Sequence, residues 1–264
     1  MQFIFSSLES EQFYCYFYSM CYVIGIKIPK KQTIKIGDKV LDLDALDIPV
    51  QSGFAYDQWP VIYNDPSGNV TQPNLRPGLM HWELIPNWAR NEKELIESRK
   101  KYTTLNIKSE TLLTKKVAAA TIYTNRCLVL ASHFFEWQEL NKEKYPHCVS
   151  VNDVPIFYIA GVWNTWTNHQ TGEIKNSFGI ITTEANALMR KIHNVKNRMP
   201  TILDDDLANS WVNENLNEKQ ITEIAATQFD TNKMSAHTVA KSFQQSIDPF
   251  EKFDYKIFTP QSLF

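Results

Sequence analysis

The stretch RCLVLASHFFEWQE, residues 126–139, gives the clearest structural signal in this chain of 264 residues. β-Branched, aromatic and other apolar residues fill two runs within it, 126–131 and 134–139. Such residues favour the pleated and half-buried surface of a sheet, and short runs of this kind are typical of antiparallel strands. We therefore expect a pair of strands at this point of the chain.

Further runs of the same type follow at 148–151, 156–159 and 178–182. The helical segments that the sequence indicates lie at 91–101, 114–124, 185–193, 204–211 and 217–227. Thr183 is placed to cap the helix 185–193. Strands in the middle and helices on the flanks predict an α+β fold, a single domain with an antiparallel β-barrel-like core surrounded by helices.

The overall charge argues against a protein that coats nucleic acid along its whole surface. Lys and Arg number 27 and Asp and Glu number 29, so the net charge is −2. Any contact with DNA must therefore come from a local basic patch. Residues 90–116 are the best candidate, because basic residues there outnumber acidic ones, although a solvated helix face would have the same composition.

The four cysteines are Cys15, Cys21, Cys127 and Cys148, and no two of them form a CxxC pair. We therefore expect neither a zinc site nor a dithiol redox centre, and no cofactor. So few cysteines in a chain of this size are typical of a reducing compartment.

The first nineteen residues are unlike the rest of the chain. They are rich in Phe and Tyr and contain no Lys or Arg, while Glu9 and Glu11 interrupt the apolar run. This composition fits neither a secretory signal nor a membrane span. We expect 1–19 to be a non-native or removable extension before a domain at 20–264, and the protein to be cytoplasmic.

Six short segments resemble those of one protein family. They are WELIPNWA (82–89), NIKSET (106–111), RCLV with FFEW (126–129 and 134–137), AGVW (160–163), ITTEAN (181–186), and His193 followed by RMPTIL (198–203). In the same order they are similar to the segments WGLIPSWA, NARSET, RCLVPADGFYEW, AGLW, ITTEAN and HxRMPVIL of the SRAP (SOS response-associated peptidase) family. Because the six motifs occur in the family's order, the chain is identified as a member of this family, with the SRAP fold.

The resemblance implies a specific chemistry for the N-terminus. In this family the mature chain begins at the cysteine of a Met-Cys pair, and Cys21 occupies that position after Met20. A terminal cysteine carries an amine and a thiol on neighbouring carbons, and the ring-opened sugar of an abasic site exposes an aldehyde. The two can close a thiazolidine ring. The implied function is a covalent crosslink that protects abasic sites in single-stranded DNA during the DNA damage response, with lyase-like activity and autoproteolytic exposure of Cys21.

The resemblance also assigns the supporting residues. Asn106 would hold the terminal amine, Glu136 would act as general acid and base, and His193 would orient Glu136 or move a proton near the sugar. The residues expected to contact DNA are Lys108, Trp82, Trp88, Arg90 and Arg198. The partner would be single-stranded DNA with abasic sites and not a membrane, and we expect a monomer that joins the nucleoid at damage.

The chain departs from the family pattern at several positions. Tyr22 and Val23 stand where the family often has Gly-Arg, Glu83 replaces a glycine, Lys108 replaces an arginine, and a short insertion separates His193 from Arg198. A lysine offers a point charge where an arginine offers a bidentate fork. We therefore expect the aminothiol chemistry to be kept and the affinity for DNA to differ.

Two other classes of function remain open on the sequence. A cysteine-dependent peptidase or amide hydrolase would use Cys21, His193 and Asn106 and would not need a free α-amine. A noncatalytic single-stranded DNA-binding module would bind reversibly, with strong salt dependence and no preference for an abasic site. Only the crosslinking reaction needs both the free amine and the thiol.

Overall fold

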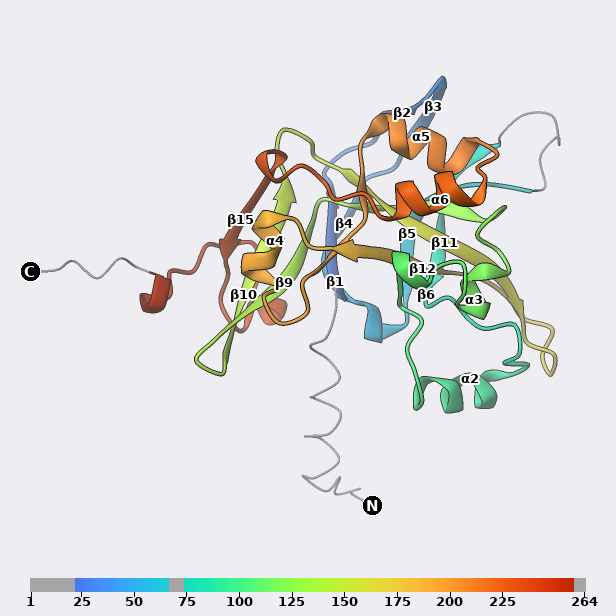
Figure 1. The fold of residues 1–264 in the computed structure, drawn as a ribbon, viewed down its shortest axis with the longest axis horizontal. Coiled ribbons are helices and arrows are strands. Elements are labelled where there is room, and N and C mark those ends of the chain that lie inside the picture. The colour runs from blue at the N-terminus through green and yellow to red at the C-terminus, as the bar shows by residue number, and fades with distance from the viewer. Residues whose placement is uncertain (1–21, 67–73, 259–264) are drawn as a thin grey trace, which may run out of the picture.

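A closed five-stranded barrel forms the centre of the molecule (Figure 1). The computed structural model describes residues 22–66 and 74–258. In order around the ring the barrel strands are β12 (Ile174–Glu184), β6 (Leu75–Trp82), β5 (Gln58–Asn64), β8 (Arg126–Ala131) and β11 (Phe157–Thr167), which pairs back with β12. The predicted α+β fold with a barrel core is confirmed. The ring is not wholly antiparallel, however, because β12 and β6 run parallel.

Large aromatic side chains fill the inside of the barrel. Trp82 stacks on Phe178 with ring centroids 6.1 Å apart, and its indole Nε1 donates to the carbonyl of Leu105 at 3.2 Å. The indole of Trp59 donates in the same way to the carbonyl of Leu130 at 2.8 Å. A buried indole N–H group needs an acceptor. These two hydrogen bonds supply it, so both tryptophans are buried without an unsatisfied donor.

A second sheet, antiparallel throughout, shares the core of the barrel. Its order is β15 (Met234–Thr238), β10 (Glu143–Val151), β9 (His133–Leu140), β1 (Val23–Ile28) and β4 (Leu46–Ser52). Phe134 of β9 enters the same apolar core as the barrel strands. Phe135 points to the other face and stacks on Phe243 and Phe250 of the C-terminal part. Strand β9 is therefore fixed from both faces.

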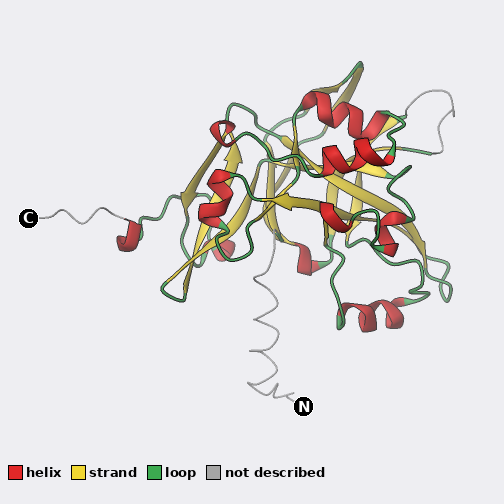
Figure 2. Ribbon diagram, in the orientation of Figure 1, coloured by secondary structure: helices red, strands yellow, loops and turns green. Residues whose placement is uncertain are grey.

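Short helices lie around the two sheets (Figure 2). The helices are α2 (Glu92–Arg99), α3 (Lys116–Ala119), α4 (Ala187–Ile192), α5 (Asp205–Asn213) and α6 (Glu218–Ala225). The 3-10 turns are Gly53–Ala55, Ser109–Thr111, Thr231–Lys233, Phe243–Gln245 and Lys256–Phe258. The remaining strands are the hairpin β2 (Gln32–Ile36) and β3 (Lys39–Leu43), together with β7 (Asn106–Lys108), β13 (Arg198–Pro200) and β14 (Ile202–Leu203).

Two expectations about the helices were wrong in detail. The segment 114–124 forms only the short helix α3 followed by turns. Thr183 does not cap α4, because β12 runs past it and its hydroxyl donates instead to the carbonyl of Ala226 at 3.0 Å. The cap is Asn186, whose side chain accepts from the N–H of Met189 at 3.0 Å.

A buried arginine joins the barrel to the end of α5. The guanidinium of Arg126 donates to the carbonyls of Trp211 at 2.5 Å, Glu214 at 2.5 Å, Ile122 at 3.0 Å and Tyr123 at 2.8 Å. Burial lowers the pKa of Arg126 to about 10. One side chain thus satisfies carbonyls at the C-terminal end of α5 and in the turns after α3.

A buried histidine connects β9 to β4. The Nε2–H of His133 donates to the carbonyl of Pro49 at 2.8 Å, and its ring lies edge-on to Phe250 with centroids 4.1 Å apart. Burial lowers the pKa of His133 to about 4, against the opposing effect of the Pro49 hydrogen bond. A Cβ on Gly25 would meet Nε2 at 1.9 Å, so only glycine fits beneath this ring.

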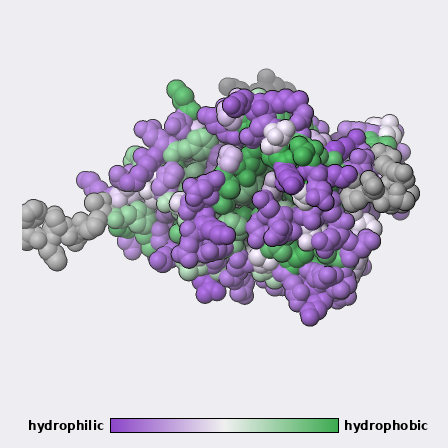
Figure 3. Space-filling model, turned by 90° about the horizontal axis from the view of Figure 1, so that it is seen from above, coloured by the Kyte–Doolittle hydropathy of each residue, from purple (hydrophilic) through white to green (hydrophobic). Residues whose placement is uncertain are grey.

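The surface is mostly hydrophilic on the face shown in Figure 3, and apolar areas lie between the polar side chains. Among residues 22–66 and 74–258, no helix is long and apolar enough to cross a membrane.

Candidate active site and nucleic-acid interface

Glu136 and His193 meet in the interior of the protein. Glu136 lies on the face of β9 that also carries Phe134, and it is buried. Helix α4 ends at Ile192, and His193 follows it as the C-cap residue, also buried. The Nδ1 of His193 lies 3.6 Å from Oε1 of Glu136. The structure thus brings together two of the residues to which the resemblance gives catalytic roles.

The imidazole of His193 is oriented by the turn that follows it. Its Nδ1 lies 3.0 Å from the carbonyl oxygen of Arg198. Because a carbonyl only accepts, the proton of the neutral ring is on Nδ1, and Nε2 is left as an acceptor. Asn197, in a left-handed conformation with φ of 53°, closes the turn by donating its N–H to the His193 carbonyl at 2.8 Å. The insertion noticed in the sequence is therefore a compact turn.

The start of β1 lies beside Glu136. Val23 pairs with Phe135, the residue before Glu136. Cys21, the expected nucleophile, lies outside the described residues, and Tyr22 is its neighbour in the sequence. The first described residues of the chain therefore approach the Glu136–His193 pair through the β1–β9 ladder.

Tyr22, one of the departures from the family pattern, is accommodated in the core. Its carbonyl accepts from the N–H of Gly53 at 2.7 Å, and its ring lies edge-on to Phe54 with centroids 4.7 Å apart. The side chain is 2% exposed. The bulk of Tyr22 therefore packs against the turn at 53–55 and does not project into solvent.

Asn106 and Lys108 lie two residues apart on β7. They therefore share one face of the strand, and Ile107 between them enters the core. Asn106 is buried, while Lys108 is exposed. Strand β7 runs parallel to β12, with Lys108 opposite Thr182. Lys108 thus marks the exposed end of the face that carries Asn106, which is a suitable place for a phosphate contact.

The described cysteines are not suited to nucleophilic chemistry. Cys127 and Cys148 are buried, and burial raises the pKa of both thiols, that of Cys148 to about 12. Thiolate, the reactive form, is therefore scarce at both positions at neutral pH. Within residues 22–66 and 74–258, no group of three or more His, Cys, Asp or Glu is arranged to hold a metal ion.

The two tryptophans expected at the DNA differ sharply in exposure. Trp88 is 53% exposed and lies edge-on to Tyr102, with ring centroids 6.2 Å apart. Trp82 is wholly buried between the barrel strands. A base could stack on Trp88 as it stands, whereas stacking on Trp82 would require the core to open. The contact expected of Trp82 is thus inconsistent with its position.

Buried polar side chains fix the loop that presents Trp88. Asn164 donates to the carbonyl of Ile85 at 2.6 Å and to Oδ1 of Asn87 at 3.2 Å. Ser177 accepts from the N–H of Ile85 at 3.1 Å and donates to Asn164 at 2.5 Å. The indole of Trp166 donates to the carbonyl of Ala89, just after Trp88. Trp88 is therefore an exposed ring on a rigid support.

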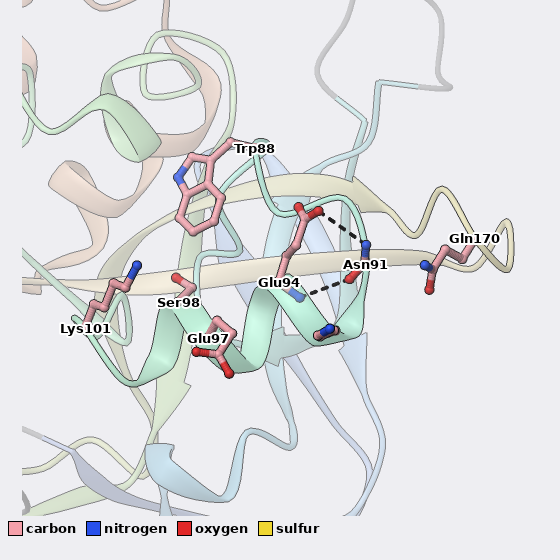
Figure 4. A pocket seen from close by; sticks show the side chains of 8 residues that line it. Trp88, Asn91, Glu94, Glu97, Ser98, Lys101 and Gln170 are labelled. Atoms are coloured by element: carbon pink, nitrogen blue, oxygen red, sulfur yellow. Dashed lines mark hydrogen bonds between the residues drawn. The ribbon is translucent and has the colours of Figure 1, made fainter.

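A surface groove of about 560 Å³ runs between Trp88 and helix α2 (Figure 4). Its lining residues are Trp88, Asn91, Lys93, Glu94, Glu97, Ser98, Lys101 and Gln170. Arg90 is exposed at the beginning of the same segment. The groove combines one aromatic wall with charges of both signs, so the basic patch predicted at 90–116 is more mixed than its composition indicated.

Arg99, counted in that basic patch, is engaged inside the protein. Its guanidinium donates to Oε2 of the buried Glu83 from Nε at 3.0 Å and from Nη2 at 2.6 Å. It also lies over the ring of Tyr56, 3.9 Å from the centroid. Glu83, which replaces the family glycine, is therefore the ion-pair partner that anchors the end of α2 to the barrel.

Arg198 is paired within the protein, whereas the resemblance led us to expect it at the DNA. The guanidinium is buried, pairs with the carboxylate of Glu110, and donates to the carbonyl of Thr182 at 2.5 Å. Partial burial acts to raise the pKa of Glu110, but the hydrogen bond from Arg198 and other contacts outweigh it, and the pKa is lowered overall. A phosphate would have to displace this carboxylate, so the position of Arg198 does not favour the expected contact.

The sequence did not reveal three polar contacts near the expected site residues: Asn164 with Ser177, Glu83 with Arg99, and Asn194 with the backbone of Glu139. For Glu83 and Asn194 a signal was present, since one replaces a family glycine and the other lies in the insertion. For Asn164 and Ser177 no motif was available, because their role depends on a loop from a distant part of the chain.

Comparison with known proteins gives consistent matches. Residues 48–246 match the family described as SOS response associated peptidase (SRAP). The abasic site processing protein YoaM of Bacillus subtilis is 32% identical over 180 residues, which cover 68% of this chain and 72% of that protein. The abasic site processing protein HMCES of Xenopus tropicalis is 32% identical over 152 residues, 50% of this chain and 44% of that protein.

A crystal structure of a protein from Bacteroides thetaiotaomicron has the same fold. It matches with a TM-score of 0.67 at 32% identity, over 77% of this chain and 82% of that one. The family match includes Asn106, Glu136 and His193 and extends from β4 through β15. The fold, the order of the motifs and these matches agree, and the chain belongs to the SRAP family.

Proposed function

We propose that this protein processes abasic sites in single-stranded DNA by forming a thiazolidine between the sugar and an N-terminal Cys21. The observation that carries the proposal is the buried pair Glu136 and His193 beside the start of β1, whose Val23 pairs with Phe135. The names of the relatives, abasic site processing proteins, support the choice of substrate.

The reaction needs two bonds to form at one carbon. The α-amine of Cys21 attacks the aldehyde carbon of the ring-opened sugar, and water leaves as the imine forms. The thiol sulfur then adds to the imine carbon, and the thiol proton ends on the nitrogen. An α-amine has a pKa of about 7.7–8.0 in peptides, so a useful fraction is nucleophilic at neutral pH.

In this proposal Glu136 carries the proton transfers. Its carboxyl group would protonate the departing water and take up protons from the attacking amine. His193, with Nδ1–H held by the Arg198 carbonyl, would orient the carboxylate and offer Nε2 as an acceptor near the sugar. General acid and base assistance of this kind is typically worth about 10²–10⁴-fold in rate. Asn106 would hold the amine from β7.

The free amine of Cys21 must first be exposed. We propose that the bond between Met20 and Cys21 is cleaved by the protein itself, with Cys21 as nucleophile and water releasing the preceding segment. Translation that starts at Met20, followed by removal of that methionine, would give the same N-terminus. DNA would be held by Lys108, Arg90 and the exposed ring of Trp88, all three on the described surface.

The test is a denaturing gel with single-stranded DNA that carries one abasic site. Intact mass spectrometry first identifies the N-terminal residue of the purified protein. A heat-stable adduct that requires a free Cys21, and that disappears in Cys21→Ala, is the expected result. An adduct-free gel with a verified Cys21 terminus would overturn the proposal. Hydrolysis of a peptide by a protein with a blocked terminus would then favour an amide hydrolase, and salt-sensitive binding alone would favour a binding module.

A further inference from the structure

We propose that Asn194 is a positioning residue that fixes His193 against Glu136. The proposal deepens the function proposed above, because it concerns the same site. Asn194 follows His193 directly and lies in the short insertion that distinguishes this chain from the family pattern. Its side chain is exposed, so the residue is not part of the hydrophobic core.

The side-chain amide of Asn194 makes two hydrogen bonds to one residue of β9. Its Oδ1 accepts from the N–H of Glu139 at 2.9 Å, and its Nδ2 donates to the carbonyl of Glu139 at 2.8 Å. A primary amide that pairs with both backbone groups of one residue reproduces the contact that a neighbouring strand would make. The bond pair thus fixes both the distance and the angle between the turn and the strand.

The contact lies on β9 close to Glu136, so it can fix the position of that residue. On one side β9 pairs with β10 from Phe134 to Leu140, with Glu139 opposite Lys144. On the other side, among the described residues, β1 pairs with β9 from His133 to Phe135. Farther along this edge of β9, Asn194 pairs with Glu139. Glu136 lies between the Val23–Phe135 pair and the two hydrogen bonds that join Asn194 to Glu139.

Each of the two residues joined by these hydrogen bonds is close in sequence to one of the proposed catalytic residues. Glu139 follows Glu136 on the same strand, and Asn194 is bonded to His193. Helix α4 and β9 lie side by side in Figure 1 and are in contact. A shift of the turn along β9 would change the 3.6 Å separation between Nδ1 of His193 and Oε1 of Glu136. Such displacements are costly in catalysis, because about 1 Å of misplacement can lower a rate by about 10²-fold.

The variant Asn194→Ala removes both bonds and should leave the core intact. The control is Asn217→Ala, which removes another exposed asparagine side chain that accepts a backbone N–H, in this case that of Gln220 at 3.0 Å. Asn217 caps α6, so its loss lowers stability without any contact to the site. A third variant, Asn194→Asp, keeps the acceptor for the Glu139 N–H and loses the donor for its carbonyl.

The experiment observes the Nδ1–H proton of His193 by NMR in the full-length chain labelled with ¹⁵N at histidine. A proton held by the Arg198 carbonyl exchanges slowly with water and gives a signal in the unmodified protein and in Asn217→Ala. We expect this signal to broaden or vanish in Asn194→Ala and to weaken in Asn194→Asp. A signal unchanged in Asn194→Ala, or lost equally in Asn217→Ala, would overturn the positioning role.

Crosslinking kinetics separate this inference from the function it rests on. We expect Asn194→Ala to lower the maximal single-turnover rate about ten- to a hundredfold and to leave the half-saturating DNA concentration unchanged. An unchanged maximal rate in Asn194→Ala, with normal adduct formation by the unmodified protein, overturns the inference. If the unmodified protein forms no adduct while the NMR signal responds as expected, the positioning role stands and the crosslinking function fails.

Discussion

The Nδ1 of His193 lies 3.6 Å from Oε1 of the Glu136 carboxyl group, and both side chains are buried. The same nitrogen donates to the carbonyl of Arg198 at 3.0 Å. The single Nδ1 proton is therefore anchored by the backbone and remains close to the carboxylate. This arrangement gives Glu136 a fixed neighbour and leaves Nε2 of the neutral imidazole as a hydrogen-bond acceptor.

The arrangement predicts different outcomes for two substitutions of His193. Asparagine can place its Nδ2 near the position of Nδ1, so His193→Asn should retain part of the orientation of Glu136 and lose only the acceptor at Nε2. His193→Ala should lose both. We expect the crosslinking rate to fall in the order unmodified, Asn, Ala, measured in single-turnover gels at saturating DNA. Equal rates for the two variants would show that the Nδ1 contact contributes nothing.

Trp88 and Trp82 should respond oppositely to truncation. Trp88→Ala removes an exposed ring, and we expect single-stranded DNA binding to weaken by about 1–3 kcal/mol with little change in stability. Trp82→Ala leaves a cavity between the barrel strands and should lower the free energy of unfolding by about 3–5 kcal/mol. Fluorescence anisotropy with labelled DNA and urea unfolding distinguish the two. A large loss of DNA affinity from Trp82→Ala in a protein of unchanged stability would contradict this assignment.

The salt dependence of binding should identify the cations that contact phosphate. Lys108 is exposed at the end of β7, so Lys108→Ala should lower the slope of log affinity against log salt concentration by about 0.7, the value for one phosphate on a single strand. Arg198 is paired with Glu110, so Arg198→Gln should leave the slope unchanged even if it lowers stability. Binding titrations at several salt concentrations check both, and a reduced slope in Arg198→Gln would mean that DNA displaces Glu110.

Arg126 should be essential for stability because of the carbonyls that it binds. Arg126→Met leaves four carbonyls at the ends of α5 and the turns after α3 without their donors, and we expect a loss of about 3 kcal/mol or more. Arg126→Lys keeps the charge, reaches fewer carbonyls and should be intermediate. Urea unfolding followed by tryptophan fluorescence measures both losses, and a Lys variant as stable as the unmodified protein would show that charge alone suffices.

The free energy of unfolding should decrease as the pH is lowered, because His133 is buried in its neutral form. Its pKa is lowered from the ordinary 6.5 to about 4 by burial. Between these values the unfolded chain binds a proton that the folded protein excludes, so this contribution is full above pH 6.5 and is lost as the pH falls toward 4. The loss amounts to about 3 kcal/mol. Urea unfolding of His133→Gln between pH 4 and 7 should show a flatter dependence, and equal slopes would exclude His133 as the cause.

Much of the second half of the fold could be predicted from sequence. Strand β8 has the predicted bounds, because its apolar run is buried at every position. Strands β10, β11 and β12 are longer than predicted, since they continue as hairpins through polar residues whose pairing replaces hydrophobic burial. The helix starts near 204 and 217 were predictable from their Asp and Asn caps.

The first half of the fold was much harder to predict. Strands β4, β5 and β6 contain Pro49, Pro60 and Pro77, and a proline within a run argues against a strand because it removes a hydrogen-bond donor. The parallel pairing of β12 with β6 and β7 depends on contacts between distant segments. Local residue patterns carry no information on such pairs.

In the candidate site, too, some features could be predicted from local motifs and others depended on packing between distant segments. The proximity of Glu136 and His193 followed from motifs, but the burial of Trp82 and the pairing of Arg198 with Glu110 did not. Whether a side chain is exposed depends on the layer that packs above it. For Arg99 the deciding partner, Glu83, comes from the loop after β6, outside the basic segment itself.

The β1–β9 ladder has a consequence for synthesis on the ribosome. Val23 finds its partner Phe135 only after the middle of the chain has emerged, and Phe135 is in turn packed by Phe243 and Phe250 near the end. At about 5–20 residues per second, those partners appear seconds after the N-terminus. In the proposed mechanism, Cys21 would therefore spend its first seconds without Glu136 and His193, its proposed acid–base partners. The proposed site would thus be completed only when the C-terminal residues have folded onto β9, and fragments from interrupted translation would not crosslink DNA.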